Sequence, residues 1–387
     1  MLSARLDGAD PTFGLSLVEV EPPPLPRPDW ARVAVDACGI CGSDLAILFP
    51  HGRGSVLMLP FVGAPMEMGH EISGTVIEAG PECPTAVGTP VAIDPTLACT
   101  ARGLAPCPRC REGALSTCLR LDDAEPVRGW AHGFASGVGG GWSEQLVCHH
   151  SQLHPVPDGV DAVTAALTEP LAVCLHGLLR SPPIDGEPAL VVGAGSLGLV
   201  TVVALAHLAP RSEVTVLARH QHQAAAARRV GARHVVMLDD DGGHFEQIAS
   251  LGGGRVTGRG RARQLVGGYM QVAEAVGTPA ALGLAMVLAG QRSVLWAMGA
   301  VGVADTDLTP LYQKELELFG SLGYGVEEHG GVRQHTFDRA LGVLAGGGLD
   351  ADLLVTHSFP LPELREAVEV AHDRAHGSVK VMVLPHR

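Results

Sequence analysis

Four side chains from three separate parts of the chain are of the types that hold a catalytic zinc ion. Cys41 lies in a turn bounded by glycines, His70 is followed directly by Glu71, and Glu169 precedes a proline. Catalytic zinc takes three protein ligands from thiolate, imidazole and carboxylate groups and keeps one position for water or substrate. Each residue alone is more often structural, but the combination predicts a zinc site with these four as candidate ligands. Such an ion would lower the pKa of an alcohol or polarise a carbonyl group.

Two residues that follow Cys41 are expected to assist this chemistry. Ser43 is placed to pass the proton of an alcohol outward, and Asp44 to accept a hydrogen bond from His70. Ordinary turn chemistry is the alternative for both, since Ser and Asp are common in turns. We therefore treat both as candidate catalytic residues.

A glycine-rich loop further along the chain predicts a dinucleotide site. The run Gly193-Ala194-Gly195-Ser196-Leu197-Gly198 follows an apolar strand predicted over 189–192 and opens a helix predicted over 197–208. Glycines permit the tight turn and the close approach of the backbone, and the helix N-terminus favours the pyrophosphate charge. A chain with 50 glycines produces such motifs by chance, but the strand and helix around this one are the required context. The predicted cofactor residues are Gly193, Gly195, Ser196, Leu197 and Gly198.

The end of the next predicted strand, 214–217, favours NADP(H) over NAD(H). NAD-specific sites usually place a carboxylate there to accept a hydrogen bond from the ribose 2′-hydroxyl. This chain has Ala218, Arg219 and His220 instead, and a planar guanidinium binds a 2′-phosphate with paired hydrogen bonds. The alternative is that Arg219 is a solvated residue at the end of a strand. A metal and a hydride carrier together predict redox chemistry between an alcohol and a carbonyl compound.

Four cysteines in one stretch predict a second, structural zinc. Cys107, Cys110 and Cys118 have the spacing C-x₂-C-x₇-C, and Cys99 lies eight positions upstream of the first of them. Four thiolates in a segment rich in Pro and Gly suit a closed zinc site. A disulfide pair is the alternative, disfavoured in the reducing cytoplasm. We expect a cytoplasmic location because the N-terminus lacks the apolar core of a signal peptide.

The elements around these residues indicate two domains. Short strand-like runs separated by Gly and Pro turns predict a β-rich body up to about residue 160. The stretch 161–180 has helical apolar spacing, and β and α segments alternate beyond it, which predicts a parallel, doubly wound sheet. The Gly- and Arg-rich segment 239–268 breaks this rhythm. We favour a solvated surface excursion there, with a docking patch for an anionic group as the alternative and the role of 252–268 left open.

The composition is that of a folded, acidic protein. Of its 387 residues, 46% are hydrophobic and 18% charged, which is too apolar for a disordered chain. The length is too great for one compact core. The net charge of −14 argues against general nucleic-acid binding, which needs basic surface. No run of about 18 uninterrupted apolar residues is present, so we expect no membrane span.

Taken together, these motifs resemble the zinc-containing medium-chain dehydrogenase/reductase superfamily, the group of alcohol, polyol and threonine dehydrogenases. The resemblance covers nearly the whole chain. The segments that carry it are 39–44, 69–74, the four-cysteine segment, 168–171, 193–198, 314–316, 320–321, 323–324 and 377–381. It implies an α/β fold with a GroES-like, β-rich catalytic domain over 1–166 and 312–387, including the zinc lobe near 99–118. It implies a Rossmann NADP-binding domain over 167–311.

The resemblance also implies roles for single residues. It implies one catalytic zinc on Cys41, His70 and an acidic residue, as well as one structural zinc. It places Lys380 near the cofactor. In relatives such as sorbitol dehydrogenase the acid is either the residue after the histidine or the one before the proline, so Glu71 and Glu169 both remain candidates.

Three departures from the family pattern limit what can be carried over. Family members usually have a cysteine at the position of Leu104, so Cys99 has to reach across the insertion 100–106. Many relatives have a histidine where this chain has Ala46, which removes a proton relay and leaves His51 as a candidate substitute. The Arg-rich segment is longer than usual, so no role transfers to it.

The leading hypothesis is a zinc-dependent oxidoreductase that transfers a hydride between NADP(H), or NAD(H), and a secondary alcohol or polyol or the matching ketone. The alternative is a non-catalytic NADP(H)-binding sensor or scaffold, which predicts a missing ligand at the reactive centre. A zinc-stabilised interaction module would explain only the cysteine segment. We expect a small-molecule substrate, no nucleic-acid or membrane partner, and a dimer or tetramer of identical chains.

Overall fold

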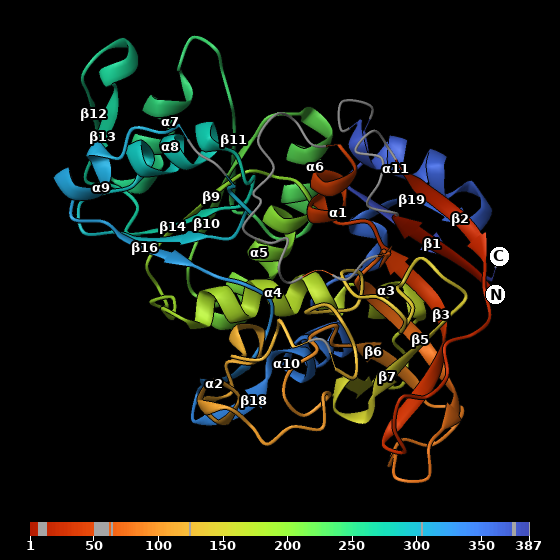
Figure 1. Cartoon of the computed structure of the whole chain (residues 1–387). Coiled ribbons are helices and arrows are strands. Elements are labelled where there is room, and N and C mark those ends of the chain that lie inside the picture. Colours follow the sequence, from red (N-terminus) through yellow and green to blue (C-terminus); the bar gives the residue numbers. More distant parts are fainter. Residues whose placement is uncertain are drawn as a thin grey trace. The chain divides into compact units, whose positions relative to one another are not determined.

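The computed structural model describes residues 1–6, 14–49, 62, 65–123, 125–302, 305–373 and 377–386. The chain folds into two compact units (Figure 1), each with its own hydrophobic core. Unit 1 comprises Met1–Ala172, Gly323–Glu327 and Val332–Arg387, and unit 2 comprises Val173–Leu322 and Glu328–Gly331. These units are defined by packing alone, so the predicted domain boundaries, 1–166 with 312–387 and 167–311, stay a proposal.

Unit 1 is built mainly of antiparallel strands. Its largest sheet has the order β19-β20-β3-β5-β6-β8, with β7 paired to β3 off this path, and a second sheet has the order β2-β1-β4. The strands are β1 (Leu2–Leu6), β2 (Leu15–Glu19), β3 (Trp30–Gly39), β4 (Met66–Glu67), β5 (Glu71–Ala79), β6 (Pro90–Ile93), β7 (Gln145–His149), β8 (Leu153–Pro155), β19 (Val355–Pro360) and β20 (Lys380–Leu384). The hairpin β17 (Val326–His329) and β18 (Val332–His335) precedes α10. The helices are α1 (Gly42–Leu48), α2 (Pro108–Glu112), α3 (Ala162–Ala166), α10 (Thr336–Ala345) and α11 (Leu364–His372).

The strand register brings separate chain segments together at one end of the large sheet. Gly39, the last residue of β3, pairs with Glu71, the first residue of β5, and with Met382 of β20. A Cβ atom on Gly39 would lie 1.8 Å from Oε2 of Glu71 and 3.1 Å from Cε of Lys380, so only glycine fits there. The turn after β3 and the turn before β5 therefore meet at this end of the sheet.

Unit 2 contains a six-stranded parallel sheet with the order β11-β10-β9-β14-β15-β16. Its strands are β9 (Ala189–Val192), β10 (Val214–Ala218), β11 (His234–Met237), β14 (Gln271–Glu274), β15 (Val294–Ala297) and β16 (Glu317–Gly320), and the separate hairpin is β12 (Arg255–Thr257) and β13 (Gln264–Val266). Its helices are α5 (Ser196–Leu208), α6 (Gln221–Arg229), α7 (His244–Gly252), α8 (Pro279–Leu288) and α9 (Thr309–Gln313). The strand order reverses between β9 and β14, the point where such sheets bind dinucleotides. The predicted doubly wound parallel sheet is confirmed.

The helical stretch predicted over 161–180 is two helices, α3 and α4 (Thr168–Leu179). Pro170 explains the break, because proline has no N–H to donate to the carbonyl of Ala166. Within the described part of the chain, the window Ala162–Leu179 is the one helical stretch long and apolar enough to cross a membrane. Of this window, 83% is buried inside the protein, as in the core helix of a globular domain.

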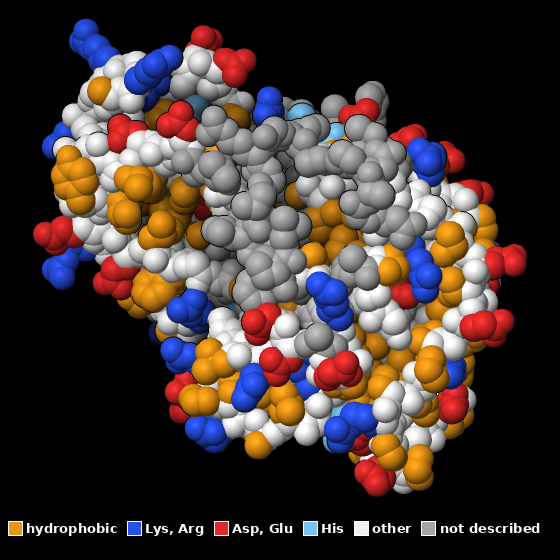
Figure 2. Space-filling model, viewed as in Figure 1, with side chains coloured by type: hydrophobic (Ala, Val, Ile, Leu, Met, Phe, Trp, Pro, Cys, Tyr) orange, Lys and Arg blue, Asp and Glu red, His pale blue; other side chains and the backbone are white. Residues whose placement is uncertain are grey.

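The segment 239–268, predicted to be a surface excursion, is only partly so. It contains helix α7, whose Phe245 and Ile248 are buried in the core of unit 2. Together with Ala249 they have the i, i+3, i+4 spacing of an amphipathic helix, which the surrounding Gly and Arg residues obscured. The hairpin β12–β13 fits the prediction better, and basic side chains stand out over it at the upper left of Figure 2.

Candidate active site

The start of a short helix positions Cys41 and Asp44. Cys41 is the residue before α1 and has an extended backbone. Its amide donates to Oδ2 of Asp44 at 2.9 Å, which holds this fully buried carboxylate against the turn. A carboxylate in the first turn of a helix is favoured, because it faces the free N–H groups of the helix N-terminus. The Cys41 side chain is half-buried, as a metal ligand near substrate has to be.

His70 lies opposite Asp44. Nδ1 of His70 lies 3.2 Å from Oδ1 of Asp44, and both side chains are buried. Burial alone would lower the pKa of His70, but Asp44 and Cys41 raise it well above its usual value. A carboxylate on Nδ1 is the usual arrangement of metal-ligating histidines, because it keeps the proton on Nδ1 and offers Nε2 to an ion. Oγ of Ser43 lies 3.4 Å from Nε2.

Glu71 is paired with a buried lysine. The ammonium group of Lys380 donates to the Glu71 carboxylate and, at 3.4 Å, to the carbonyl oxygen of Ile40. Burial alone would lower the pKa of Lys380, but Glu71 raises it above its usual value. Both side chains of the pair are buried. The expected place of Lys380 near the cofactor stays a prediction, since its described partners are these two groups.

Glu169 is held by a tyrosine that the sequence analysis did not place in the site. The buried hydroxyl of Tyr324 donates to Oε1 of Glu169. Burial raises the pKa of Glu169 to about 7, although His70 lowers it. The backbone of Tyr324 is fixed by the Ser116 hydroxyl, which accepts from its N–H at 2.6 Å and donates to its carbonyl at 2.8 Å. Tyr324 and Glu169 are 155 residues apart, so no local pattern signals their contact.

The structure brings three of the four predicted ligands together. One ligand atom each from Cys41, His70 and Glu71 lies within 4.8 Å of the other two. Thiolate, imidazole and carboxylate in this arrangement fit a zinc ion with a fourth position open for water or substrate. Glu169 is outside this set in the described structure, although it is close enough for the charge of His70 to act on its pKa.

Replacing Asp44 by asparagine is expected to weaken zinc binding by about 10- to 100-fold. Asp44 accepts from the Cys41 amide and faces Nδ1 of His70, whereas an asparagine has one acceptor atom and leaves one of these donors unpaired. Competition with a chelator would measure the zinc affinity. Asp36→Asn is the matched control, because the described partner of that carboxylate is the Thr75 hydroxyl at 2.8 Å. Equal zinc affinity in the two variants would contradict the positioning role.

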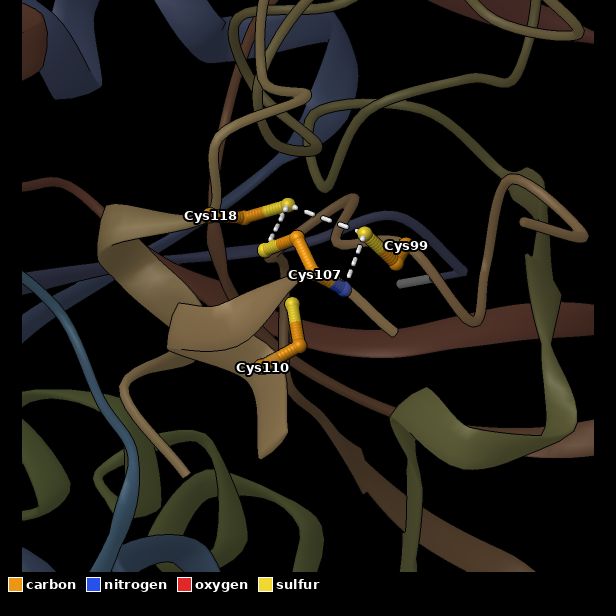
Figure 3. Close-up of side chains that lie close together, drawn as sticks. All are labelled: Cys99, Cys107, Cys110 and Cys118. Carbon is orange, nitrogen blue, oxygen red and sulfur yellow. Dashed lines mark hydrogen bonds between the residues drawn. The ribbon is translucent and has the colours of Figure 1, made fainter. Parts of the chain in front are cut away.

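The four thiols of the predicted zinc lobe lie together (Figure 3). Their sulfur atoms are within 4.8 Å of one another. Sγ of Cys118 lies 3.5 Å from Sγ of Cys99 and 3.9 Å from that of Cys107. The Cys107 amide also donates to Sγ of Cys99 at 3.4 Å. All nine cysteines are described and free, so the structure does not support the disulfide alternative.

Cys99 reaches the other three because the insertion 100–106 folds around a buried arginine. Arg102 is only 3% exposed, and its guanidinium donates to five backbone carbonyls at 2.6–3.4 Å. These carbonyls belong to Leu97, Leu121, Asp123, Val127 and Gly129. Carbonyl partners on all sides satisfy the fork of donors that a guanidinium carries. The insertion is thus a folded part of the lobe, and it sets Cys99 beside the other cysteines.

In unit 2 the glycine-rich loop joins β9 to α5. Gly193 has a φ of 106°, and a Cβ on Gly198 would lie 2.1 Å from the carbonyl oxygen of Gly193, so both positions require glycine. A Cβ on Gly195 would have nothing within 4 Å, which shows open space beside the helix N-terminus. Oγ of Ser196 is buried and has no hydrogen-bond partner among the described residues. An open backbone and an unpaired hydroxyl at a helix N-terminus fit a phosphate group.

Two other predicted cofactor residues, Leu197 and Arg219, also belong to unit 2. Leu197 is half-buried in the first turn of α5. Arg219 is exposed and directly follows β10, the strand next to β9. The end of this strand is where dinucleotide-binding sheets read the ribose 2′ position. His51, named as a candidate relay, lies outside the described residues.

Comparisons with known proteins agree with this architecture. Residues 27–158 match the family described as alcohol dehydrogenase GroES-like domain. A sorbitol dehydrogenase of Arabidopsis thaliana is 28% identical over 382 residues, which cover 95% of this chain and 93% of the plant protein. The solved 2R,3R-butanediol dehydrogenase of Bacillus subtilis is 25% identical with a TM-score of 0.75, over 100% of this chain and 99% of its own. A structure from Sinorhizobium meliloti 1021, described as a zinc-binding dehydrogenase bound to NADP, is 26% identical with a TM-score of 0.74, over 99% of each chain.

These similarities extend over both units. The GroES-like match lies within unit 1, and the parallel sheet of unit 2 has the strand order of dinucleotide-binding domains. The predicted fold class, a GroES-like domain with a Rossmann domain, is confirmed. The chain belongs to the zinc-type medium-chain dehydrogenase/reductase family and is an oxidoreductase of the alcohol dehydrogenase type.

Proposed function

We propose that this protein is a zinc-dependent oxidoreductase that transfers a hydride between NADP(H) and a secondary alcohol or polyol, or the matching ketone. The observation that carries the proposal is the meeting of ligand atoms from Cys41, His70 and Glu71 within 4.8 Å. Relatives named sorbitol dehydrogenase and butanediol dehydrogenase support an alcohol or polyol substrate. The sensor or scaffold alternative is less well supported, because the predicted donor residues are all present.

In this proposal Cys41, His70 and one carboxylate hold the zinc. Glu71 is the carboxylate within the set, and Glu169 is the alternative. When bound, the zinc supplies Lewis acidity that lowers the pKa of the alcohol or polarises the carbonyl group. Lys380 forms an ion pair with the buried Glu71 carboxylate.

Ser43 is our candidate for moving the proton of the alcohol. Its hydroxyl both donates and accepts hydrogen bonds, and Oγ lies 3.4 Å from Nε2 of His70. The side chain is half-buried, so it connects the buried site to solvent. It takes the proton from the substrate oxygen and passes it outward.

NADP(H) is the proposed hydride carrier. The glycine loop and Ser196 offer an open helix N-terminus to the pyrophosphate. Arg219 offers a guanidinium to the 2′-phosphate, at a place where NAD-specific sheets have a carboxylate. The structure from Sinorhizobium meliloti that is bound to NADP supports this choice.

Arg219→Ala is expected to lower the preference for NADP⁺ over NAD⁺. A hydrogen bond to a charged group is worth about 1.5–3 kcal/mol, or roughly 10- to 150-fold in the ratio of kcat/KM values. Kinetics with both cofactors and one alcohol would measure the ratio. Arg229→Ala, which removes an exposed arginine from the last turn of α6, is the control. An unchanged ratio in Arg219→Ala would remove this residue from the site.

Metal analysis combined with a panel of alcohols tests the whole proposal. Turnover of a secondary alcohol with NADP⁺, together with zinc at both the catalytic site and the cysteine lobe, is the expected result. Zinc at the lobe alone, without turnover of any alcohol, would favour the sensor or scaffold instead. Cys41→Ala assigns the catalytic ion, because it should lose that zinc and keep the zinc of the lobe.

Two further proposals concern the structural zinc and the oligomeric state. We propose that Cys99, Cys107, Cys110 and Cys118 hold a structural zinc, since four sulfur atoms within 4.8 Å of one another suit a closed zinc site.

We also propose that identical chains associate as a dimer or tetramer. Size-exclusion chromatography with light scattering would measure the second, and a monomer at micromolar concentration would contradict it.

A further inference from the structure

An aspartate and two histidines form a cluster of metal-ligand side chains elsewhere in unit 1. Asp94 directly follows β6, His154 lies in β8, and His335 is the last residue of β18. One ligand atom of each lies within 4.8 Å of the other two. Asp94 and His154 are 3% and 7% exposed, so both side chains are shielded from bulk solvent. The proposed catalytic zinc and the cysteine lobe use none of these residues.

The hydrogen bonds around the cluster orient its ligand atoms toward one another. Oδ1 of Asp94 accepts the amide of Thr96 at 2.8 Å, and its other oxygen lies 3.3 Å from Nε2 of His335. Nδ1 of His154 lies 2.6 Å from Oδ1 of Asp338. The rings of His154 and His335 are 4.7 Å apart between centroids.

His154 and His335 each have a buried Nε2 without a hydrogen-bond partner among the described residues. The contact with Asp338 favours the tautomer with its proton on Nδ1, which leaves the lone pair on Nε2 of His154. This atom is buried and has no hydrogen-bond partner in the described part of the chain. Buried polar atoms without partners are rare. A carboxylate on one nitrogen and a free lone pair on the other is how metal-ligating histidines are arranged.

We propose that Asp94, His154 and His335 bind a divalent transition-metal ion, with zinc as the ion that fits best. Two imidazoles and one carboxylate are ligands that zinc accepts in tetrahedral sites, with water as the fourth. Asp338 is a positioning residue that fixes the tautomer of His154. Its side chain is 47% exposed.

A metal-free ion pair explains only part of the cluster. Nδ1 of His335 accepts a hydrogen bond from the amide of Phe337 at 3.1 Å at the start of α10, so in a neutral ring Nε2 carries the proton, 3.3 Å from Asp94. This contact does not give Nε2 of His335 a hydrogen bond, and Nε2 of His154 has none either among the described residues. Binding of an ion would move the His335 proton to Nδ1 and break the bond to Phe337. The amide resonance of Phe337 should therefore shift when zinc is added.

The ion would link three separate segments of unit 1. It would join the end of β6, β8 and the start of α10. Phe337 of α10 packs edge-on against Tyr324, with ring centroids 4.9 Å apart and an interplanar angle of 88°. Tyr324 in turn donates to Glu169. The ion would therefore stabilise the position of Phe337, and through it that of Tyr324, the partner of Glu169.

Metal content of matched variants tests this site. Wild type, Asp94→Asn, His154→Gln and the control His357→Gln, a half-buried histidine of β19, are loaded with zinc, desalted and analysed for zinc per chain. Asp94→Asn and His154→Gln should each hold one equivalent less than wild type and His357→Gln. Equal zinc in all four proteins would overturn the proposal.

Loading with cobalt separates this site from the two that contain sulfur. Cobalt on thiolates gives sulfur-to-metal charge-transfer absorption, and the cluster has no sulfur ligand. Asp94→Asn and His154→Gln should lose one equivalent of cobalt and keep this absorption, whereas Cys41→Ala should lose part of it and keep the cluster ion. A loss of charge-transfer absorption in Asp94→Asn and His154→Gln would overturn the assignment, since the missing metal would then come from the sulfur sites. If Cys41→Ala keeps all of its charge-transfer absorption, this result would count against the proposed catalytic zinc and not against the cluster site.

Discussion

Replacement of Cys41 or His70 by alanine is expected to lower kcat/KM for the alcohol by about 10³-fold or more. Each side chain offers one of three ligand atoms that lie within 4.8 Å of one another, and two remaining ligands are too few for a catalytic zinc. Metal polarisation is worth several kcal/mol, and about 1.4 kcal/mol of barrier is tenfold in rate. Steady-state kinetics with NADP⁺ and zinc analysis of each variant would measure the effect.

The same variants should keep most of their NADPH affinity. Cys41 and His70 belong to unit 1, whereas the glycine loop 193–198 belongs to unit 2. A fluorescence titration with NADPH would measure binding. Cys83→Ala is the control, because it removes a half-buried free thiol that is outside the metal-ligand clusters of the described residues. Retained turnover in both Cys41→Ala and His70→Ala would defeat the zinc mechanism.

Breaking the buried pair of Glu71 and Lys380 is expected to cost about 3–5 kcal/mol of unfolding free energy. In Glu71→Gln the Lys380 ammonium, whose side chain is 2% exposed, loses its charged partner. In Lys380→Met the Glu71 carboxylate, 1% exposed, is left without its cation. The double variant contains neither charge, so in the zinc-free protein it should recover most of the loss. Urea denaturation of the wild type and the three variants would measure the coupling.

This set of variants also distinguishes two roles of Glu71, as the partner of Lys380 and as a zinc ligand. If Glu71 serves mainly the ion pair, zinc content stays near wild type in the double variant and stability returns. If Glu71 is the carboxylate on the zinc, the Glu71→Gln single variant and the double variant both lose the ion, and the double variant stays unstable. This result would exclude Glu169 as the carboxylate ligand. Arg211→Met is the control, since it breaks a surface pair with Asp185 whose side chains are 76% and 32% exposed. Such a pair contributes less than about 1 kcal/mol, and a loss as large as that of the buried pair would show that the assay does not distinguish them.

Several features could be predicted from the sequence because their causes lie within a few residues. The glycine loop, the strand before it and the helix after it follow from backbone rules over 189–208. The doubly wound sheet follows from the alternation of strands and helices. Helix α7 was missed, because its three buried apolar residues span only five positions and the flanking segments are rich in glycine and arginine.

Residue contacts over long separations could not be predicted in this way. Tyr324 reaches Glu169 across 155 residues, and His154 reaches Asp338 across 184. Arg102 brings Cys99 to the other cysteines through carbonyls that no motif specifies. Such contacts depend on which strands pair and in which register, and a slip of one residue would turn every side chain to the other face.

The sequence by itself therefore determined the fold class and the kinds of side chain available for metal and phosphate. It left Glu71 and Glu169 as two candidates for the carboxylate ligand of the catalytic zinc. Only the tertiary structure decided that Glu71 lies beside Cys41 and His70, because Gly39 of β3 pairs with the first residue of β5. The physical reason is that residue type is a local property, whereas proximity between distant segments is set by the packing of the whole unit.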